Sequence, residues 1–156
     1  MMVMVGAPDY GVYYIKDLPQ LKIFRDGINR GLEFYYSSAD QTFSLAFDEN
    51  YPRVVPANGK NATFVLLDNI NMSSESDWMP IGTEKSSFQG DFNGNGKVVS
   101  NATWTMSRFY NGLFGKAENA VIRNLIMENC VFNTVKNNNN WQYYFAEGKK
   151  VNFELL

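Results

Sequence analysis

The sequence predicts an all-β fold in which short strand units stack as a solenoid, with one amphipathic helix near the start. Three short apolar runs bounded by turn residues share the pattern Asn, apolar or small, any residue, apolar. Their unequal spacing of roughly twenty to thirty residues is typical of a solenoid with variable loops. A length of 156 residues suits one domain, so 1–156 is treated as a single unit.

The first element is a helix over 17–31. Asp17 can cap its N-terminus, Pro19 falls in the first turn, and Gly31 is a stop signal. Gly27 lowers the helix propensity by about 1 kcal/mol relative to Ala. We therefore expect the helix to be stabilised by packing of its apolar face, which holds Leu21, Phe24 and Ile28.

Residues 32–60 are predicted to form inserted strands and a loop. The aromatic residues at 34–36 and the partly alternating run at 42–47 favour one or two strands. Two prolines follow, and then Asn58-Gly59, a dipeptide that can close a hairpin.

Residues 61–132 are predicted to form the coils of the solenoid. The shared pattern aligns Asn69, Asn101 and Asn124, and we expect these asparagines to stack at a bend between successive coils. The three runs are Thr63–Met72, Val98–Trp104 and Ala120–Phe132. Residues 133–156 are interpreted as a C-terminal strand pair that turns at Glu147-Gly148.

Trp78–Gly96 is interpreted as a structural corner, because its glycines and asparagines tolerate the backbone of tight turns. Its large apolar residues, with two from the later Gly112–Gly115, are predicted to pack inside: Trp78, Ile81, Phe88, Phe92, Leu113 and Phe114.

Six segments stand in order along about half the chain: L-x-x-F-R-D-G-I-N-R-G from Leu21, V-L-L-D-N-I-N-M from Val65, W-M-P-I-G from Trp78, F-Q-G-D-F-N-G-N-G-K-V-V-S-N from Phe88, G-L-F-G from Gly112 and V-I-R-N-L-I-M-E-N from Val121. They resemble bacterial surface proteins with the so-called GLUG motif, including the non-catalytic repeat region beside IgA-specific metallopeptidases. The resemblance implies a right-handed parallel β-helix, here of about three coils, whose first coil is covered by the N-terminal helix. It also implies an extracellular or cell-surface location. The family joins helix and first strand by a short connection, whereas here some thirty residues intervene.

The composition argues against several kinds of catalytic, metal-binding and nucleic-acid-binding function. The chain has no histidine, which removes the commonest general base and metal ligand, and no H-E-x-x-H zinc motif can exist. The net charge of −2 and the scattered basic residues argue against a nucleic-acid partner. No apolar run is long enough for membrane insertion, and no cofactor is expected. Cys130 lies in an apolar run and is expected to be a buried, inert thiol.

One stretch begins like a calcium-binding loop. Asp91, Asn93 and Asn95 offer oxygen ligands at alternate positions, followed by a glycine at position six. Position twelve, which requires a bidentate carboxylate, is Ala102, and no flanking helices are predicted. This candidate metal site is therefore rejected in favour of a tight turn.

Two further kinds of candidate site remain. A carbohydrate-active enzyme would need two carboxylates in one groove, to be sought among Asp68, Asp77, Glu84 and Asp91. Trp141, Tyr143 and Tyr144 are the candidate aromatic platform for sugar rings. The cluster of Tyr10, Tyr13 and Tyr14 with the aromatic residues at 34–36 could form another, although core packing is the commoner role of such residues.

The leading hypothesis is a non-catalytic module for adhesion or display on a bacterial surface. The partner would be a host or bacterial surface ligand. A glycan-binding module is the alternative, and a carbohydrate-active enzyme is a weaker one. Self-association through exposed strand edges at the ends of the coils is a further expectation.

Overall fold

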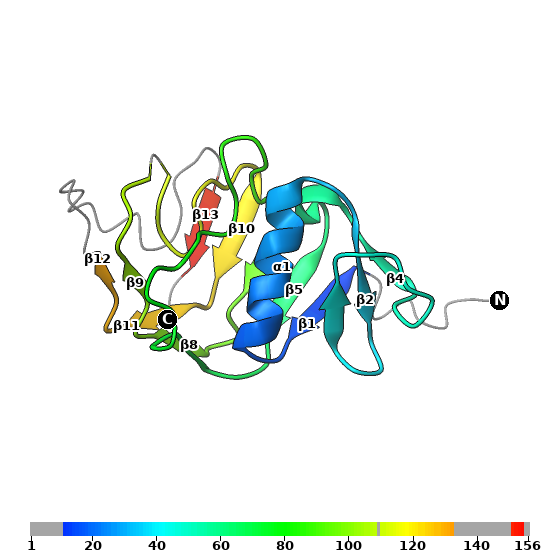
Figure 1. The fold of residues 1–156 in the computed structure, drawn as a ribbon, viewed down its shortest axis with the longest axis horizontal. Helices are drawn as coiled ribbons and strands as arrows, with labels where there is room; N and C mark the ends of the chain where they lie inside the picture. The colour runs from blue at the N-terminus through cyan, green and yellow to red at the C-terminus, as the bar shows by residue number, and fades with distance from the viewer. Residues whose placement is uncertain (1–10, 109, 133–150, 155–156) are drawn as a thin grey trace.

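The structure is a computed structural model that describes residues 11–108, 110–132 and 151–154, the last four by their backbone alone (Figure 1). Its largest element is a five-stranded parallel sheet. The order of its strands is β1 (Val12–Ile15), β5 (Thr63–Leu66), β7 (Asp91–Asn93), β10 (Ala120–Arg123) and β13 (Val151–Glu154). In register, Phe64 pairs with Phe92, and Phe92 pairs with Ile122. Three apolar side chains therefore follow one another across the sheet, and all three are fully buried.

Two smaller parallel sheets continue from the ends of these strands. One has the order β11 (Ile126–Glu128), β8 (Val98–Ser100) and β6 (Ile70–Asn71), and the other pairs β12 (Val131–Phe132) with β9 (Thr103–Trp104). Each predicted apolar run is thus broken into two or three short strands. Isolated parallel bridges also join Ile81 to Phe114 and Phe88 to Ala117.

The fourth sheet is antiparallel and comes from the inserted segment after the helix. Its order is β3 (Thr42–Ser44), β2 (Phe34–Ser37) and β4 (Arg53–Val55). Side chains alternate between its two faces, as the pleat of a strand requires. The inner face is buried and consists of Phe34, Tyr36, Phe43 and Val55.

The helix forms where the sequence predicts it. α1 (Leu18–Arg30) begins after Asp17, whose carboxylate accepts a hydrogen bond of 3.0 Å from the Gln20 backbone N–H. It ends at Gly31, whose φ of 71° is in the left-handed region. Figure 1 shows α1 in front of the parallel sheet, and Phe24 accordingly lies 4.6 Å from Phe64 between ring centroids. The helix therefore covers the sheet with its apolar face.

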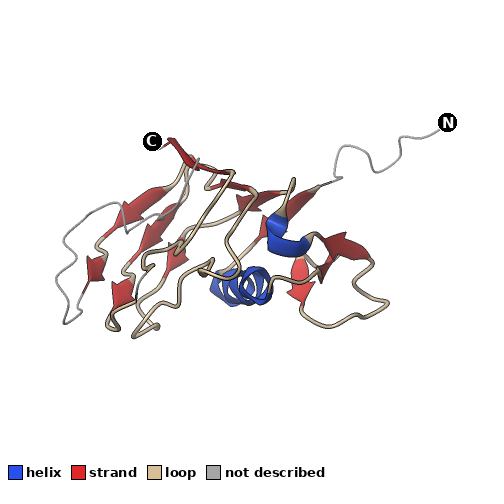
Figure 2. Cartoon of the chain, turned by 90° about the horizontal axis from the view of Figure 1, so that it is seen from above, coloured by secondary structure: helices blue, strands red, loops and turns tan. Residues whose placement is uncertain are grey.

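The expected fold class, an all-β right-handed parallel β-helix of about three coils with a capping helix, is wrong. The described chain has four separate sheets, three parallel and one antiparallel, together with one α-helix (Figure 2). The inserted segment accounts for much of the difference. Its antiparallel sheet contributes Phe34, Tyr36 and Phe43 to the same apolar core as the parallel strands, so it is an integral layer of the fold.

The expected alignment of the asparagines is also wrong in register. Ile70 pairs with Val99, whereas the pattern placed it beside Ala102. Asparagines do join neighbouring strands, but through other pairs. Asn101 Nδ2 donates to Asn71 Oδ1 over 3.0 Å, and Asn124 Nδ2 donates to Asn93 Oδ1 over 3.2 Å.

The predicted interior residues are confirmed, since all six are fully buried: Trp78, Ile81, Phe88, Phe92, Leu113 and Phe114. Trp78 also uses its polar atom, because its indole N–H donates to the Leu113 carbonyl over 3.1 Å. This hydrogen bond joins the segment Trp78–Gly96 to the later segment Gly112–Gly115. Across the described ranges, no helix combines the length and apolar character required to cross a membrane.

Candidate functional site

The candidate calcium ligands do not converge. The Asp91 carboxylate accepts a hydrogen bond of 2.9 Å from Arg123 Nε. Asn93 Oδ1 accepts from the Asn95 N–H and from Asn124, while Asn95 Nδ2 donates to the Leu66 carbonyl. These polar atoms bind neighbouring strands, and in the part of the chain that the structure describes no cluster of acidic or cysteine side chains is suited to a metal ion.

The four candidate carboxylates are engaged separately. Asp77 forms an ion pair with Arg108, and Asp91 forms one with Arg123. Asp68 accepts from the Asn69 backbone N–H, and Glu84 lines a small hollow beside Met79. Among the described residues, no hydrogen bond joins any two of these four carboxylates.

Asp77 is the most strongly held of them. Burial alone would raise its pKa, but hydrogen bonds from Arg108 and from the backbone N–H groups of Thr105 and Met106 outweigh that effect, so the pKa lies below its usual value of 3.8. The carboxylate thus stays ionised and fixes the 105–108 loop, which is a structural task.

The aromatic platform of Trp141, Tyr143 and Tyr144 lies outside the described residues. Cys130 is half-buried, which differs from the expected full burial. Burial nevertheless raises the pKa of its thiol, despite hydrogen bonds with the Ala102 and Glu128 backbone. The thiolate is therefore disfavoured, as for an unreactive cysteine.

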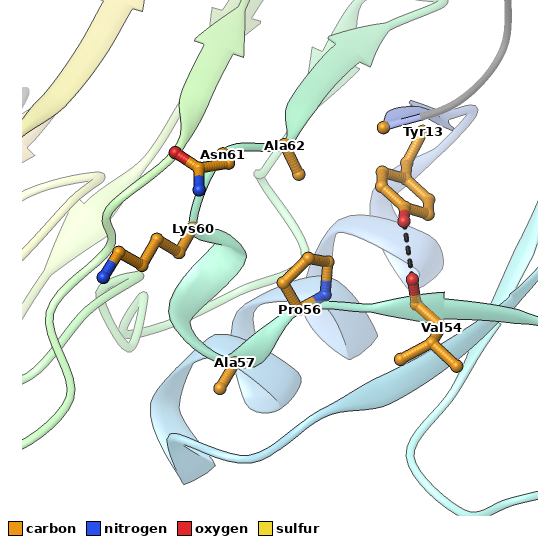
Figure 3. A pocket seen from close by; sticks show the side chains of 8 residues that line it. Tyr13, Val54, Pro56, Ala57, Lys60, Asn61 and Ala62 are labelled. Atoms are coloured by element: carbon orange, nitrogen blue, oxygen red, sulfur yellow. Dashed lines mark hydrogen bonds between the residues drawn. The ribbon is translucent and has the colours of Figure 1, made fainter. Parts of the chain in front are cut away.

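A pocket of about 430 Å³, lined entirely by described residues, opens beside the first strand and is a candidate binding site (Figure 3). Its volume lies in the range of small-molecule sites, roughly 300–1,000 Å³. Eight residues line it: Gly11, Tyr13, Val54, Pro56, Ala57, Lys60, Asn61 and Ala62. They come from β1, the end of β4 and the corner that leads into β5, so three separate segments build one hollow.

The Tyr13 side chain is held rigidly at the pocket. Its hydroxyl donates to the Val54 carbonyl over 2.6 Å, which ties β1 to β4. Its ring stacks on Phe64 at 5.4 Å and lies under the Arg53 guanidinium at 4.3 Å. A ring covered on both faces and bonded at its hydroxyl is fixed in place. With 4% of its surface exposed, Tyr13 supports the pocket from beneath.

The opposite side of the pocket is a corner at residues 56–61. The 3₁₀ turn η2 (Ala57–Gly59) follows Pro56, and Asn58 and Gly59 adopt φ values of 62° and 69°. Asn61 repeats this left-handed conformation at 63°. Asn58-Gly59 therefore does not close a hairpin. β4 pairs with β2, while β5 pairs with β1 and β7.

The corner is fixed to the core by two hydrogen bonds from one side chain. Asn58 Nδ2 donates to Ser86 Oγ over 2.9 Å and to the Ser87 carbonyl over 2.8 Å. Gly59 is buried, and a Cβ at this position would lie 2.9 Å from the Phe64 ring. The corner thus sits at a defined distance from Tyr13.

Two polar side chains at the pocket are not engaged. Lys60 and Asn61 are both exposed, and within the described residues the Lys60 ammonium and the Asn61 amide form no hydrogen bond or ion pair. Figure 3 shows them on one side of the pocket, their polar ends turned away from Tyr13 and Val54 on the other side, with Pro56 and Ala62 between. The site therefore combines an apolar wall with free donors on one flank.

Sequence reasoning named Tyr13 in a candidate aromatic platform, but the structure buries this ring and those of Phe34 and Tyr36 in the core. It missed the pocket itself. The only local signal is the run from Pro56 to Asn61, where a proline, two asparagines and a glycine indicate a special backbone. Its position against Tyr13 and Val54 depends on strand pairings far apart in the chain. No protein family, curated protein or solved structure matches this chain.

Proposed function

We propose that this chain is a non-catalytic binding module, displayed on a bacterial surface, that attaches to glycans through the pocket beside β1. The observation that carries the proposal is the pocket itself. It pairs an apolar wall of Val54, Pro56 and Ala57 with the unengaged donors of Lys60 and Asn61. Sugar rings have apolar C–H faces and hydroxyl edges, which require such a combination.

The surface location is supported by the ordered signatures that resemble the GLUG-motif proteins, from Leu21 to Asn129. The non-catalytic character is supported by the carboxylates. Asp77 and Asp91 are each neutralised by a different arginine, whereas glycoside cleavage needs two carboxylates that face one bond. Adhesion and display need only a ligand and an exposed site.

A glycan array that carries neutral and acidic oligosaccharides tests the binding function. The wild-type chain is expected to bind a subset of the glycans, and Ala57→Phe, which fills the pocket, is expected to abolish that binding. The matched control is Ala46→Phe, which adds the same ring at an exposed position outside the pocket. Absence of binding by the wild type would overturn the glycan proposal. Equal binding by Ala57→Phe and wild type would overturn the pocket as its site.

Two further measurements test the remaining parts of the proposal. An antibody against the chain is expected to label intact cells of the source bacterium, and labelling only after permeabilisation would overturn the surface location. Bound oligosaccharides are expected to be recovered unchanged after long incubation. The release of new reducing ends would show catalysis.

A further inference from the structure

We infer that the pocket selects acidic sugars, those with a ring carboxylate, and that Lys60 and Asn61 bind this carboxylate. The inference rests on the proposed function and names the chemical class of the ligand. It starts from the charges around the pocket. Lys60 is the only charged residue among the eight that line it.

A cation beyond the lining residues adds to the positive charge of Lys60. Arg53 lies over the Tyr13 ring at 4.3 Å and directly precedes the lining residue Val54. Its guanidinium is occupied, since Nη1 also donates to Ser38 Oγ over 3.0 Å. Arg53 therefore contributes positive potential from behind the wall, while Lys60 is the cation that is free to touch a ligand.

The two free side chains match the chemistry of a carboxylate. An ammonium and a primary amide both donate, and hydrogen bonds from a charged donor to a carboxylate are about twice as strong as neutral ones. Lys60 and Asn61 are adjacent in sequence, and the left-handed backbone at Asn61 turns the chain between them. A neutral sugar would satisfy the amide but leave the ammonium with water alone.

Tight direct binding of a ring carboxylate also fits the exposure of the site. Lys60 is exposed to solvent, so a ligand can approach it without displacing a protein partner. The apolar wall would hold the C–H face of the ring, and the flank would hold the acid group. Selectivity then comes from the flank, and general sugar affinity from the wall.

Calorimetric titration with glucuronate and with glucose tests the inference. Glucuronate is expected to bind roughly tenfold more tightly than glucose, which is the ratio that one charge-assisted hydrogen bond supplies. Lys60→Met is expected to remove this ratio by weakening glucuronate binding alone, and Lys60→Arg to retain it. Lys85→Met, which removes an exposed cation outside the pocket, is the matched control.

A second variant probes the amide without disturbing the backbone. Asn61→Asp tolerates the left-handed conformation and sets a carboxylate beside Lys60, so it is expected to abolish the preference for glucuronate. Its melting temperature reports whether it folds. Equal affinity for both sugars in the wild type, or an unchanged ratio in Lys60→Met, would overturn the acidic selection while leaving glycan binding in place. Absence of binding by either sugar, together with an array that binds no glycan, would overturn the proposed function itself.

Discussion

The Tyr36 hydroxyl makes two hydrogen bonds to the backbone of Tyr14. It accepts from the Tyr14 N–H over 3.0 Å and donates to the Tyr14 carbonyl over 2.9 Å. On the other side of β1, the Gly11 carbonyl accepts from the Thr63 N–H and the Ile15 carbonyl accepts from the Leu67 N–H. One phenol thus occupies the two backbone groups of Tyr14 that would otherwise be open to another strand, and so helps to protect this edge of β1.

Removal of this hydroxyl is expected to weaken the fold. Tyr36→Phe loses two hydrogen bonds at about 1 kcal/mol each, so the free energy of unfolding should fall by about 2 kcal/mol in a urea titration. Tyr14→Phe is the control, because only the backbone of Tyr14 takes part in the contact. The same urea midpoint for Tyr36→Phe and wild type would contradict this role. Size-exclusion chromatography of the variant also tests whether the freed edge promotes self-association.

Alkaline conditions should act on the same residue. Burial raises the pKa of Tyr36 above its usual 10.0, and the hydrogen bond with the Tyr14 backbone and the charge of Arg53 only partly oppose this. The folded state therefore binds the phenol proton more tightly than the unfolded state. This contribution to stability is fully present below pH 10 and is lost as the pH rises through the folded pKa. Unfolding measured from pH 8 to 12 should show the loss in the wild type, and a smaller one in Tyr36→Phe.

Acid should act through Asp77. Its folded pKa lies below 3.8, so the stability that it contributes is present above that pH and is lost as the pH falls through the folded pKa. At neutral pH, Asp77→Asn should reduce the free energy of unfolding by about 2 kcal/mol, since charge-assisted bonds to Arg108 and the 105–106 backbone are weakened.

Asp91→Asn is the comparison for this effect, because its ion pair with Arg123 is more exposed. A smaller cost is expected there, below about 1 kcal/mol. If the two variants lost equal stability at pH 7, or if Asp77→Asn followed the acid unfolding curve of the wild type, the special role of Asp77 would be wrong.

Gly82 should tolerate no side chain. A Cβ there would lie 2.2 Å from the Lys116 carbonyl oxygen, and its φ of 91° is in the left-handed region. Gly11 shares such a φ, at 76°, but a Cβ would meet its nearest atom only at 3.8 Å. Gly11→Ala should therefore cost about 1 kcal/mol for the backbone strain alone, and Gly82→Ala about 3 kcal/mol or more. Thermal unfolding compares them, and equal costs would exclude the close approach as the cause.

The helix could be predicted because its signals are local. Asp17, Pro19 and Gly31 mark its ends within the segment itself, and Leu21, Phe24 and Ile28 recur with the helical period. The buried aromatic residues of Trp78–Gly96 were predictable for a similar reason, since large apolar side chains between glycines have few alternatives to the interior.

The register and the pocket could not be predicted because both depend on distant pairings. Asparagine occurs both at turns and between strands. The shared pattern at Asn69 and Asn101 therefore did not determine which residues of the neighbouring strands pair with each other. The inserted sheet held the same ambiguity, because the alternation at Thr42–Phe47 does not indicate which strand it meets. The pocket forms because the end of β4 lies beside Tyr13, and this position depends on how the inserted sheet pairs.

The parallel registry also has a kinetic consequence. Paired residues of neighbouring parallel strands lie 28 to 31 positions apart in the chain, as for Thr63 with Asp91 and Ala120 with Val151, and 51 positions apart between β1 and β5. Each such strand pair can form only after a long loop has closed, so the entropy cost of closure precedes any stabilising hydrogen bond. This places folding in the slow, non-local regime of milliseconds to seconds. The helix and the antiparallel strands need only short closures. We therefore expect the inserted segment and α1 to order early and to offer Phe24, Phe34 and Phe43 as the surface on which the slower parallel strands assemble.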